Sequence, residues 1–386
     1  MRRRPPPSLP ALAALAALAL PVSADATPAS PTSAGVSMGD IFISGSGGRW
    51  RGNALDPLGD RAGTDRAAYG CGWWGCRHDP ALVYGASARN GCDRSDVAPI
   101  ASAPIRVDLR VNLACSGARA ENVWREANGG VAHRGEPPQA DQLATVAART
   151  DVELVVLTVG ANDMGFGRLV LGCVLAWTTT PARDPGHCSP GAQARLAATM
   201  PRARAGVRKA IREVGAVMRD AGYEAGDYLL LVSSYASPLP RGADIRYPES
   251  SWARLHTGGC PVWNADADWA RSLATPFITD TLAWAAAAEG ARFLDLSRVL
   301  AGHELCHADA QRVSSVDPPS AARSEWVRAI APGQGSLREA LHPNAFGQRA
   351  IGRCIGLAFV APHGDWTCRR RGPGIGSAYL TPAAGR

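Results

Sequence analysis

A histidine and a glutamate near the C-terminal end of the chain have the spacing of a catalytic base and its partner. The segment "EALHPNAFGQ" contains Glu339 and, three positions later, His342. An imidazole titrates close to neutral pH and can therefore act as a general base. A carboxylate that accepts a hydrogen bond from the other ring nitrogen would fix the tautomer. The pair predicts a base, His342, that removes a proton from a nucleophile, with Glu339 orienting it.

Two further segments offer hydrogen-bond donors for an oxyanion. "NLACSGA" contains Gly117, which lets a backbone N–H approach a bound group closely. "VGANDMGFG" contains Asn162, whose side-chain amide can donate to a negative charge developing on a carbonyl oxygen. Each residue also has a structural explanation, since Gly117 could serve a turn, Asn162 could cap a helix and His342 could precede a helix start. Their joint occurrence in this order favours a site for acyl transfer.

The turn that should carry the nucleophile has no reactive side chain at the expected position. In "SMGDIFISGSGGRW", a short apolar stretch leads to Gly39 and Asp40 and then to Ile41. The backbone N–H of Ile41 could still contribute to an oxyanion hole, but its side chain cannot attack a carbonyl. Ser44 is a candidate substitute because it lies one helical turn after Ile41. That turn displaces the hydroxyl by about 5 Å, which is large where reacting atoms must lie roughly 3–3.5 Å apart.

One motif points to different chemistry. "HELCH" matches the pattern H-E-x-x-H, in which His303 and His307 would bind zinc and Glu304 would be the base of a metalloprotease. That mechanism needs both histidines on one face of a helix, whereas this segment directly follows a predicted strand. It also contains Cys306, which we expect in a disulfide. A zinc protease is therefore the least favoured of the functions considered.

The elements that must position these residues alternate between strands and helices. A continuous or alternating apolar run predicts a strand, and apolar residues at 3.6-residue spacing predict a helix. The alternation requires crossover connections, so we predict an α/β three-layer α/β/α sandwich with a mainly parallel sheet and the site at the carboxyl ends of its strands. Residues 50–104 read as a long disulfide-tied loop region. The predicted strands are 35–44, 105–115, 152–160, 228–235 and 291–300, and the predicted helices are 139–150, 192–222 with a break or start at Pro201, 266–290 and 344–360.

The N-terminal region has the pattern of a secretory signal peptide, which we place at residues 1–24. Three arginines precede an apolar stretch that is too short to span a bilayer comfortably, and small residues follow it. We expect a linker at 25–35, a single domain at 36–368 and a flexible tail at 369–386. The protein is thus predicted to be secreted, without stable insertion into a membrane.

The cysteines agree with export. All 10 lie after the predicted signal peptide, and an even number in an oxidising compartment favours disulfides. Connectivity does not follow from sequence, and proximity along the chain only suggests five pairs. These are Cys71–Cys76, Cys92–Cys115, Cys173–Cys188, Cys260–Cys306 and Cys354–Cys368.

The formal net charge of +7 does not indicate nucleic-acid binding. Part of that charge lies in the predicted signal peptide, and Lys209 is the only lysine. No run of basic residues is interleaved with aromatic residues, as a stacking groove for nucleic acid would require. We expect a small-molecule substrate, no nucleic acid, and a monomer.

Across residues 36–360, these segments resemble the SGNH/GDSL hydrolase family, in its secreted, disulfide-bonded bacterial esterase and lipase branch. "NLACSGA" resembles the second conserved block of that family, "GANDMGF" the third and "EALHPNAFGQ" the fifth. "YGCGWWGCRHDPALVYGAS", "GCDRSDVAPI" and "GGCPVWNADADWAR" also resemble segments of this branch. The resemblance implies a flavodoxin-like sandwich and hydrolysis of carboxylic esters through an acyl-enzyme, without a metal or other cofactor. The implied substrate is an ester, a lipid or an acylated glycan.

The resemblance also assigns roles and exposes two departures. Backbone N–H groups of residues 41 and 117 and the amide of Asn162 would form the oxyanion hole, and His342 would be the base. The family usually has aspartate where this chain has Glu339, although some of its members orient the histidine with a main-chain carbonyl instead. It has serine where this chain has Ile41. We therefore expect an ester-hydrolase scaffold with strongly impaired activity. The alternative is a non-catalytic protein that binds an acyl or glycan ligand in the same cleft.

Overall fold

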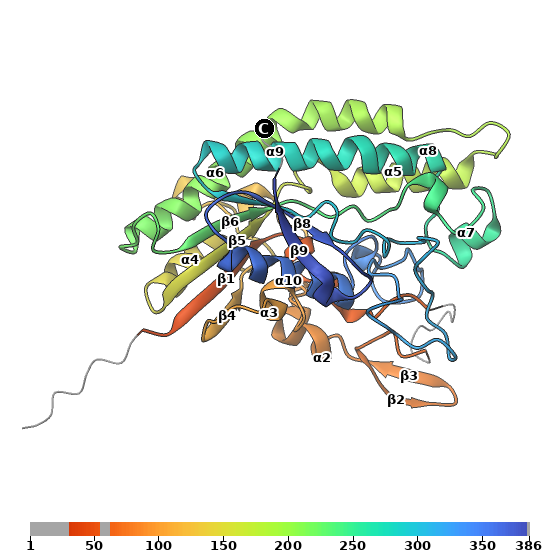
Figure 1. The fold of residues 1–386 in the computed structure, drawn as a ribbon, viewed down its shortest axis with the longest axis horizontal. Coiled ribbons are helices and arrows are strands. Elements are labelled where there is room, and N and C mark those ends of the chain that lie inside the picture. The colour runs from red at the N-terminus through yellow and green to blue at the C-terminus, as the bar shows by residue number, and fades with distance from the viewer. Residues whose placement is uncertain (1–30, 55–61, 384–386) are drawn as a thin grey trace, which may run out of the picture. The chain divides into compact units, whose positions relative to one another are not determined.

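A parallel sheet forms the centre of the fold (Figure 1). The structure is a computed structural model that describes residues 31–54 and 62–383. Within these residues, seven strands form one sheet in the order β4-β1-β5-β6-β7-β8-β9, and every neighbouring pair is parallel except β8 with β9. The strands are β1 (Ser33–Gly39), β4 (Leu109–Asn112), β5 (Asp151–Thr158), β6 (Leu229–Ser233), β7 (Arg292–Asp295), β8 (Trp366–Arg370) and β9 (Ala378–Pro382).

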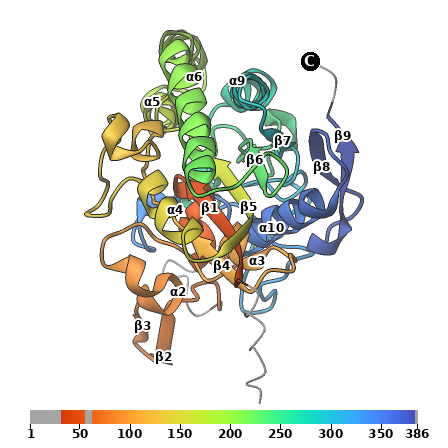
Figure 2. The same cartoon turned by 90° about the vertical axis from the view of Figure 1, so that its left-hand side faces the viewer.

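Helices cover both faces of the sheet, which confirms the predicted three-layer α/β class (Figure 2). One layer contains α4 (Gln139–Ala147), α6 (Ser189–Asp220) and α9 (Thr275–Ala288), and the other contains α3 (Pro99–Ser102) and α10 (Ala345–Val360). Strand β5 serves both layers, since Val155 and Leu157 pack toward the first and Leu154 and Val156 toward the second. A strand buried on both faces reads as a continuous apolar run, as this one does.

The remaining helices and a two-stranded hairpin lie in the connections between these strands and helices. They are α1 (Ile41–Ser44), α2 (Ala81–Tyr84), α5 (Phe166–Thr179), α7 (Trp252–His256), α8 (Asn264–Trp269) and a separate hairpin of β2 (Ala68–Gly72) and β3 (Gly75–His78). Five disulfides join the same cysteine pairs that proximity along the chain suggested. In the described part of the chain, none of the helices combines the length and apolar character needed to cross a membrane.

Several predicted boundaries were wrong. The predicted signal peptide lies outside the described residues, but β1 already begins at Ser33, inside the predicted linker. The predicted flexible tail contains β9, which pairs with β8 as an added antiparallel strand. Helix α6 runs without a break through Pro201, where the missing N–H leaves only an exposed carbonyl unpaired. The predicted helix at 266–290 is split by a π-helical turn at Ala270–Ala274, between α8 and α9.

The strand order contains a topological switch at β1. From β1 the chain first adds β4 on one side and then crosses to β5 on the other side. In open α/β sheets, a crevice forms outside the carboxyl ends of the strands at such a point. The carboxyl ends of β1 and β5 therefore mark the place where a site is expected.

Candidate active site

A cavity of about 430 Å³ lies at this switch point, beyond the ends of β1, β5 and β6. Its lining includes four residues that the sequence singled out, namely Ile41, Gly117, Asn162 and His342. These residues are spread over 302 positions of the chain. Ile41, Gly117 and Asn162 follow strands of the sheet, and His342 lies just before α10.

The end of β1 is held in one conformation by two constraints. Gly39 has φ of +129°, and a Cβ atom on it would lie 1.8 Å from the carbonyl oxygen of Thr158. Only glycine fits such a position. The buried side-chain amide of Gln139 accepts from the N–H of Gly39 at 2.6 Å and donates to its carbonyl at 2.9 Å. The chain then leaves the sheet with Asp40 as the N-cap of α1, where its carboxylate accepts from the N–H of Phe42.

This geometry places Ile41 at the first helical position, where a backbone N–H has no partner within the helix. No described residue accepts from that N–H. The side chain of Ile41 lines the cavity. The position that would carry a nucleophile thus contributes an unpaired backbone donor and an inert side chain.

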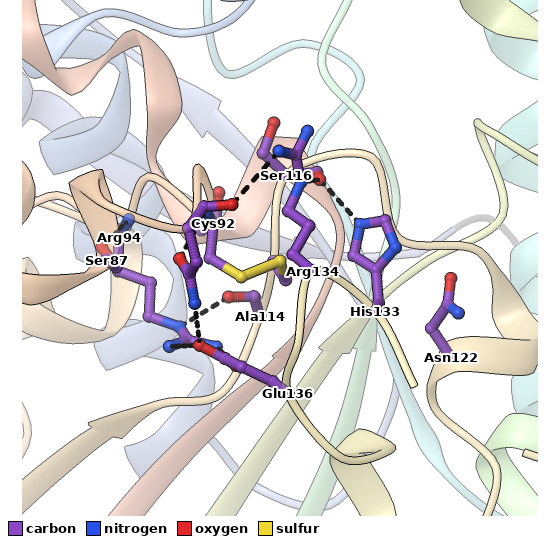
Figure 3. Close-up of a disulfide and its surroundings, with 12 residues drawn as sticks. Ser87, Cys92, Arg94, Ala114, Ser116, Asn122, His133, Arg134 and Glu136 are labelled. Atoms are coloured by element: carbon purple, nitrogen blue, oxygen red, sulfur yellow. Dashed lines mark hydrogen bonds and ion pairs between the residues drawn. A yellow bond between two sulfur atoms is a disulfide. The ribbon is translucent and has the colours of Figure 1, made fainter. Parts of the chain in front are cut away.

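The loop that leads to Gly117 is held by a disulfide and by hydrogen bonds to Ser116, which Figure 3 shows. The Cys92–Cys115 disulfide anchors its start, and the carbonyl of Ser116 accepts from Nε2 of His133 at 3.0 Å and Nε of Arg134 at 2.8 Å. In a trans peptide the C=O and the following N–H point in opposite directions. The two side chains that hold the Ser116 carbonyl therefore also set the direction of the Gly117 N–H, which has no acceptor among the described residues.

A second group of bonds braces the same loop. Arg94 donates to the carbonyls of Ala114 and Leu113 and forms an ion pair with Glu136. The carboxylate of Glu136 also accepts from the side-chain amide of Asn90. The loop before Gly117 is thus held by a covalent bond, an ion pair and side-chain hydrogen bonds together.

Asn162 follows β5 and presents an amide with two N–H donors. One of them donates to the carbonyl of Ala118 at 2.9 Å, which fixes the side chain beside Gly117. The second N–H is left for a ligand in the cavity that Asn162 lines. Ile41, Gly117 and Asn162 thus each have an N–H without an acceptor among the described residues, and all three line one cavity.

His342 is a neutral base oriented by the main chain. Its Nδ1 donates to the carbonyl oxygen of Ala340 at 2.9 Å, so the proton of the neutral ring sits on Nδ1 and Nε2 carries the lone pair. Burial lowers the pKa of His342 to about 4, because desolvation disfavours the charged ring. The imidazole is therefore unprotonated and available as an acceptor at neutral pH.

Glu339 does not orient His342, and the predicted contact between them was wrong. Its carboxylate accepts from Nε1 of Trp50 and from the hydroxyl of Tyr84, both at 2.8 Å. It also closes a capping box by accepting from the N–H of Ser336. Burial raises the pKa of Glu339, although these bonds oppose that effect. Glu339 ends a short 3-10 turn and faces the protein interior, so the carbonyl of Ala340 takes the orienting role.

Ser44 is not placed as a substitute nucleophile. It is fully buried, its hydroxyl donates to the carbonyl of Ile41 at 3.3 Å, and it lies beside the hydroxyl of Ser46. It is not part of the cavity lining. One turn of helix α1 carries the hydroxyl into the protein rather than along the cavity wall.

The zinc-protease interpretation of "HELCH" is also contradicted. The segment forms turns instead of a helix, so its two histidines do not share a helix face. His303 donates to the carbonyl of Ser324 and stacks on Trp326, while Glu304 pairs with Arg271 and Cys306 is bonded to Cys260. Residues 31–54 and 62–383 contain no group of three His, Cys, Asp or Glu side chains suited to a metal ion.

Tyr235 is a cavity residue that the sequence analysis missed. Its hydroxyl donates to the carboxylate of Asp40 at 2.5 Å and accepts from the N–H of Ala161 at 3.1 Å. This chain of bonds links the ends of β1, β5 and β6. Burial raises the pKa of Asp40 to about 7, and the bond from Tyr235 opposes that rise. Tyr235 follows a buried strand, so the rule that marked the ends of β1 and β5 could also have marked it.

Comparison with solved structures gives distant likenesses. The chain is similar to an extracellular lipase from Streptomyces rimosus, with 21% identity, a TM-score of 0.44, and coverage of 86% of this chain and 100% of that chain. It is similar to a phospholipase A1 from Streptomyces albidoflavus, with 19% identity, a TM-score of 0.46 and the same coverage. A carbohydrate acetylesterase from Sinorhizobium meliloti has 11% identity and a TM-score of 0.30, over 84% of this chain and 96% of that chain. No protein-family model matches the chain, and no curated protein matches it.

Proposed function

We propose that the protein is an ester-hydrolase scaffold of the SGNH type whose activity is strongly impaired because Ile41 stands in place of a serine nucleophile. One arrangement supports this proposal. The unpaired N–H groups of Ile41 and Gly117, the amide of Asn162 and the neutral imidazole of His342 belong to one cavity. Donors for an oxyanion beside a neutral base are what acyl transfer from an ester requires.

The proposed chemistry assigns one task to each group. Nε2 of His342 accepts the proton of an attacking hydroxyl, and the donors at positions 41, 117 and 162 stabilise the negative oxygen of the tetrahedral intermediate. Without a hydroxyl at position 41 no acyl-enzyme forms there, and only water can attack. In a serine protease, loss of the nucleophile costs on the order of 10⁶ in kcat and leaves roughly 10³–10⁴ over water.

The surroundings of the cavity suit an apolar acyl group. A second, apolar cavity of about 80 Å³ adjoins it, and the two share Phe166, Pro238, Thr275, Ile278 and Leu341 in their linings. An ester whose carbonyl lies near Gly117 and Asn162 could extend its acyl chain into this space. We propose a carboxylic ester, a lipid or an acylated glycan as the substrate class.

Export belongs to the same proposal. Five disulfides within the described residues fit an oxidising compartment, in agreement with the predicted signal peptide. We propose that the protein is secreted and acts as a monomer on a small substrate, not on nucleic acid.

The alternative function is a binding protein that holds an acyl or glycan ligand without turning it over. The side chain of Ile41 favours this alternative, because it fills part of the cavity and supplies no nucleophile. The two functions predict different results when a hydroxyl is restored at position 41.

The test compares hydrolysis of a short-chain aryl ester by the native protein, Ile41→Ser, and Ile41→Ser combined with His342→Ala. We expect Ile41→Ser to raise kcat/KM at least about 100-fold, since the donors and the base are in place. The added His342→Ala should remove that gain. If Ile41→Ser gains nothing while remaining folded, the hydrolase scaffold is wrong and the binding function is preferred.

Ser44→Ala serves as the matched control, because Ser44 is the nearest hydroxyl to Ile41 along α1 but faces the interior. We expect its rate to equal that of the native protein. A native protein that hydrolyses the ester rapidly and loses this on Ser44→Ala would overturn the assignment of Ile41 as the cause of impairment.

A further inference from the structure

A basic groove lies next to the cavity, and we propose that it binds an anionic phosphate or carboxylate group carried by the same molecule whose ester enters the cavity. This inference rests on the proposed function for the identity of the ester, and on the groove itself for the anion. The groove encloses about 1020 Å³ and shares Asn162 with the cavity. Five cations line it, namely Arg119, Arg168, Arg195, Arg202 and Lys209.

The regular spacing on α6 produces one wall of this groove. Arg195, Arg202 and Lys209 follow one another at seven-residue intervals, which places them on nearly the same face of a helix and about 10 Å apart. Small residues, Ala198 and Gly206 among them, lie between these cations and leave the hollow open. The sequence of α6 thus builds a stripe of positive charge along a groove.

The other wall comes from α5 and the loop after Gly117. Helix α5 lies beside α6 (Figure 2), and the Cys173–Cys188 disulfide joins it to the start of α6. Arg168 in the first turn of α5 is only six residues from Asn162, and Arg119 follows Gly117 by two. The cations of this wall therefore belong to the same two connections that carry Asn162 and Gly117.

Three arginines of the groove lack the carboxylate partner that two neighbouring arginines of α6 have. Arg208 and Arg212 both pair with Glu289. Among the described residues, by contrast, no carboxylate lies within ion-pair distance of Arg168, Arg195 or Arg202. A charge that the protein leaves unpaired can pair with a ligand, and the guanidinium fork fits phosphate and carboxylate oxygens.

Two carboxylates in the lining do not cancel this charge. Glu121 and Asp163 face five cations. Asp163 is already engaged by the N–H of Ala120, and burial raises its pKa to about 6. Lys209 keeps its place by lying over the ring of Trp124 and donating to the carbonyl of Asn128. The groove therefore carries a net positive charge at neutral pH.

The test measures binding rather than turnover, so that it does not depend on Ile41. Two short-chain lipids with the same acyl groups are titrated as monomers into the native protein by calorimetry. One is dihexanoyl phosphatidylglycerol, whose phosphate carries a negative charge, and the other is dihexanoylglycerol, which has no charged group. We expect tighter binding of the anionic lipid, and Arg168→Gln/Arg202→Gln should weaken it roughly tenfold while leaving the binding of the uncharged lipid unchanged.

A matched control removes the same number of charges elsewhere. Arg149→Gln/Arg212→Gln changes two exposed arginines outside the groove lining, and we expect it to bind both lipids as the native protein does. Equal binding of the two lipids, or equal weakening by both double variants, would contradict the proposal that the groove binds the anion. Inorganic phosphate that binds as tightly as the anionic lipid would overturn the link between the anion and the ester.

The same measurements separate this inference from the proposed function. If Ile41→Ser stays inert on a neutral aryl ester while Arg168→Gln/Arg202→Gln weakens the anionic lipid, the hydrolase scaffold fails and the anion site stands. If Ile41→Ser is active and the groove variant binds both lipids like the native protein, the scaffold stands and the groove fails.

Discussion

Nδ1 of His342 lies 2.9 Å from the main-chain oxygen of Ala340, so the backbone two residues earlier sets the orientation of the candidate base. The nearby carboxylate of Glu339 is occupied by Trp50 and Tyr84. A backbone acceptor carries no net charge and cannot be lost by protonation. The base is therefore oriented without the acidic partner that many hydrolytic triads use.

This relationship predicts that Glu339→Gln lowers the stability of the fold and leaves the catalytic rate nearly unchanged. In the Ile41→Ser background, we expect kcat/KM to change by less than about threefold, because His342 keeps its acceptor. The free energy of unfolding should fall by roughly 1–3 kcal/mol, since the new amide cannot accept all of the buried donors now bonded to the carboxylate. Ester hydrolysis and urea unfolding of the same samples check both parts. A loss of activity as large as that of His342→Ala would contradict the backbone role.

Arg134→Met should reduce turnover because it loosens the peptide group between Ser116 and Gly117. Arg134 lines the cavity, and its Nε donates to the Ser116 carbonyl and thereby sets the direction of the Gly117 N–H. Removing one oxyanion donor costs about 10²–10³ in kcat, and loosening it while His133 remains should cost about tenfold. In the Ile41→Ser background we expect kcat to fall with little change in KM. The exposed Arg89→Met is the control. An equal fall of kcat in both variants would contradict the role of Arg134 in directing the Gly117 N–H.

Gln139→Leu should destabilise the turn into α1. The N–H of Gly39 would lose its buried acceptor, while the Gly39 carbonyl would keep a bond from the N–H of Cys115. We expect the free energy of unfolding to fall by about 1–3 kcal/mol. Thr145→Leu at an exposed position of the same helix is the control, and it should change the free energy of unfolding by less than about 0.5 kcal/mol. Similar free energies of unfolding for the two variants in urea would show that the bonds between Gln139 and Gly39 contribute little.

Asp40→Asn should change how stability depends on pH. The pKa of Asp40 is raised from 3.8 to about 7, so between these values the folded state holds a proton that the unfolded state releases. Stability from this group is therefore lost as the pH rises toward 7. Relative to Asp40→Asn, the native protein should lose stability over this range and then level off. Unfolding free energies at pH values on both sides of 7 measure the difference, and parallel curves would refute it.

Much of the sheet was predictable because its strands are buried on both faces. The apolar run of β5 and the strand before Tyr235 follow directly from that burial. Helix α5 was missed because its apolar residues are continuous rather than periodic, and several of them are exposed. β9 was missed because a short strand at a sheet edge has no buried run to mark it.

The sequence predicted which residues line the site but not which contacts their side chains make. Gly117, Asn162 and His342 follow from their segments, since the ends of parallel strands meet at one edge. The residue types alone did not predict the partner of His342, because a backbone acceptor leaves no trace in the side-chain pattern. Only the family resemblance offered a main-chain carbonyl as an alternative to Glu339. The direction of Ser44 could not be known either, since α1 lasts only one turn and has no periodicity to read.

The two outer strands of the sheet have a consequence for behaviour at high concentration. An exposed strand edge can pair with another molecule and start aggregation. One outer strand, β4, has only 4 residues and includes the exposed Arg110. The other, β9, ends at Pro382, which has no N–H to offer a further strand. Short length, charge and proline thus guard the two edges, and the folded protein should stay dispersed in concentrated solution.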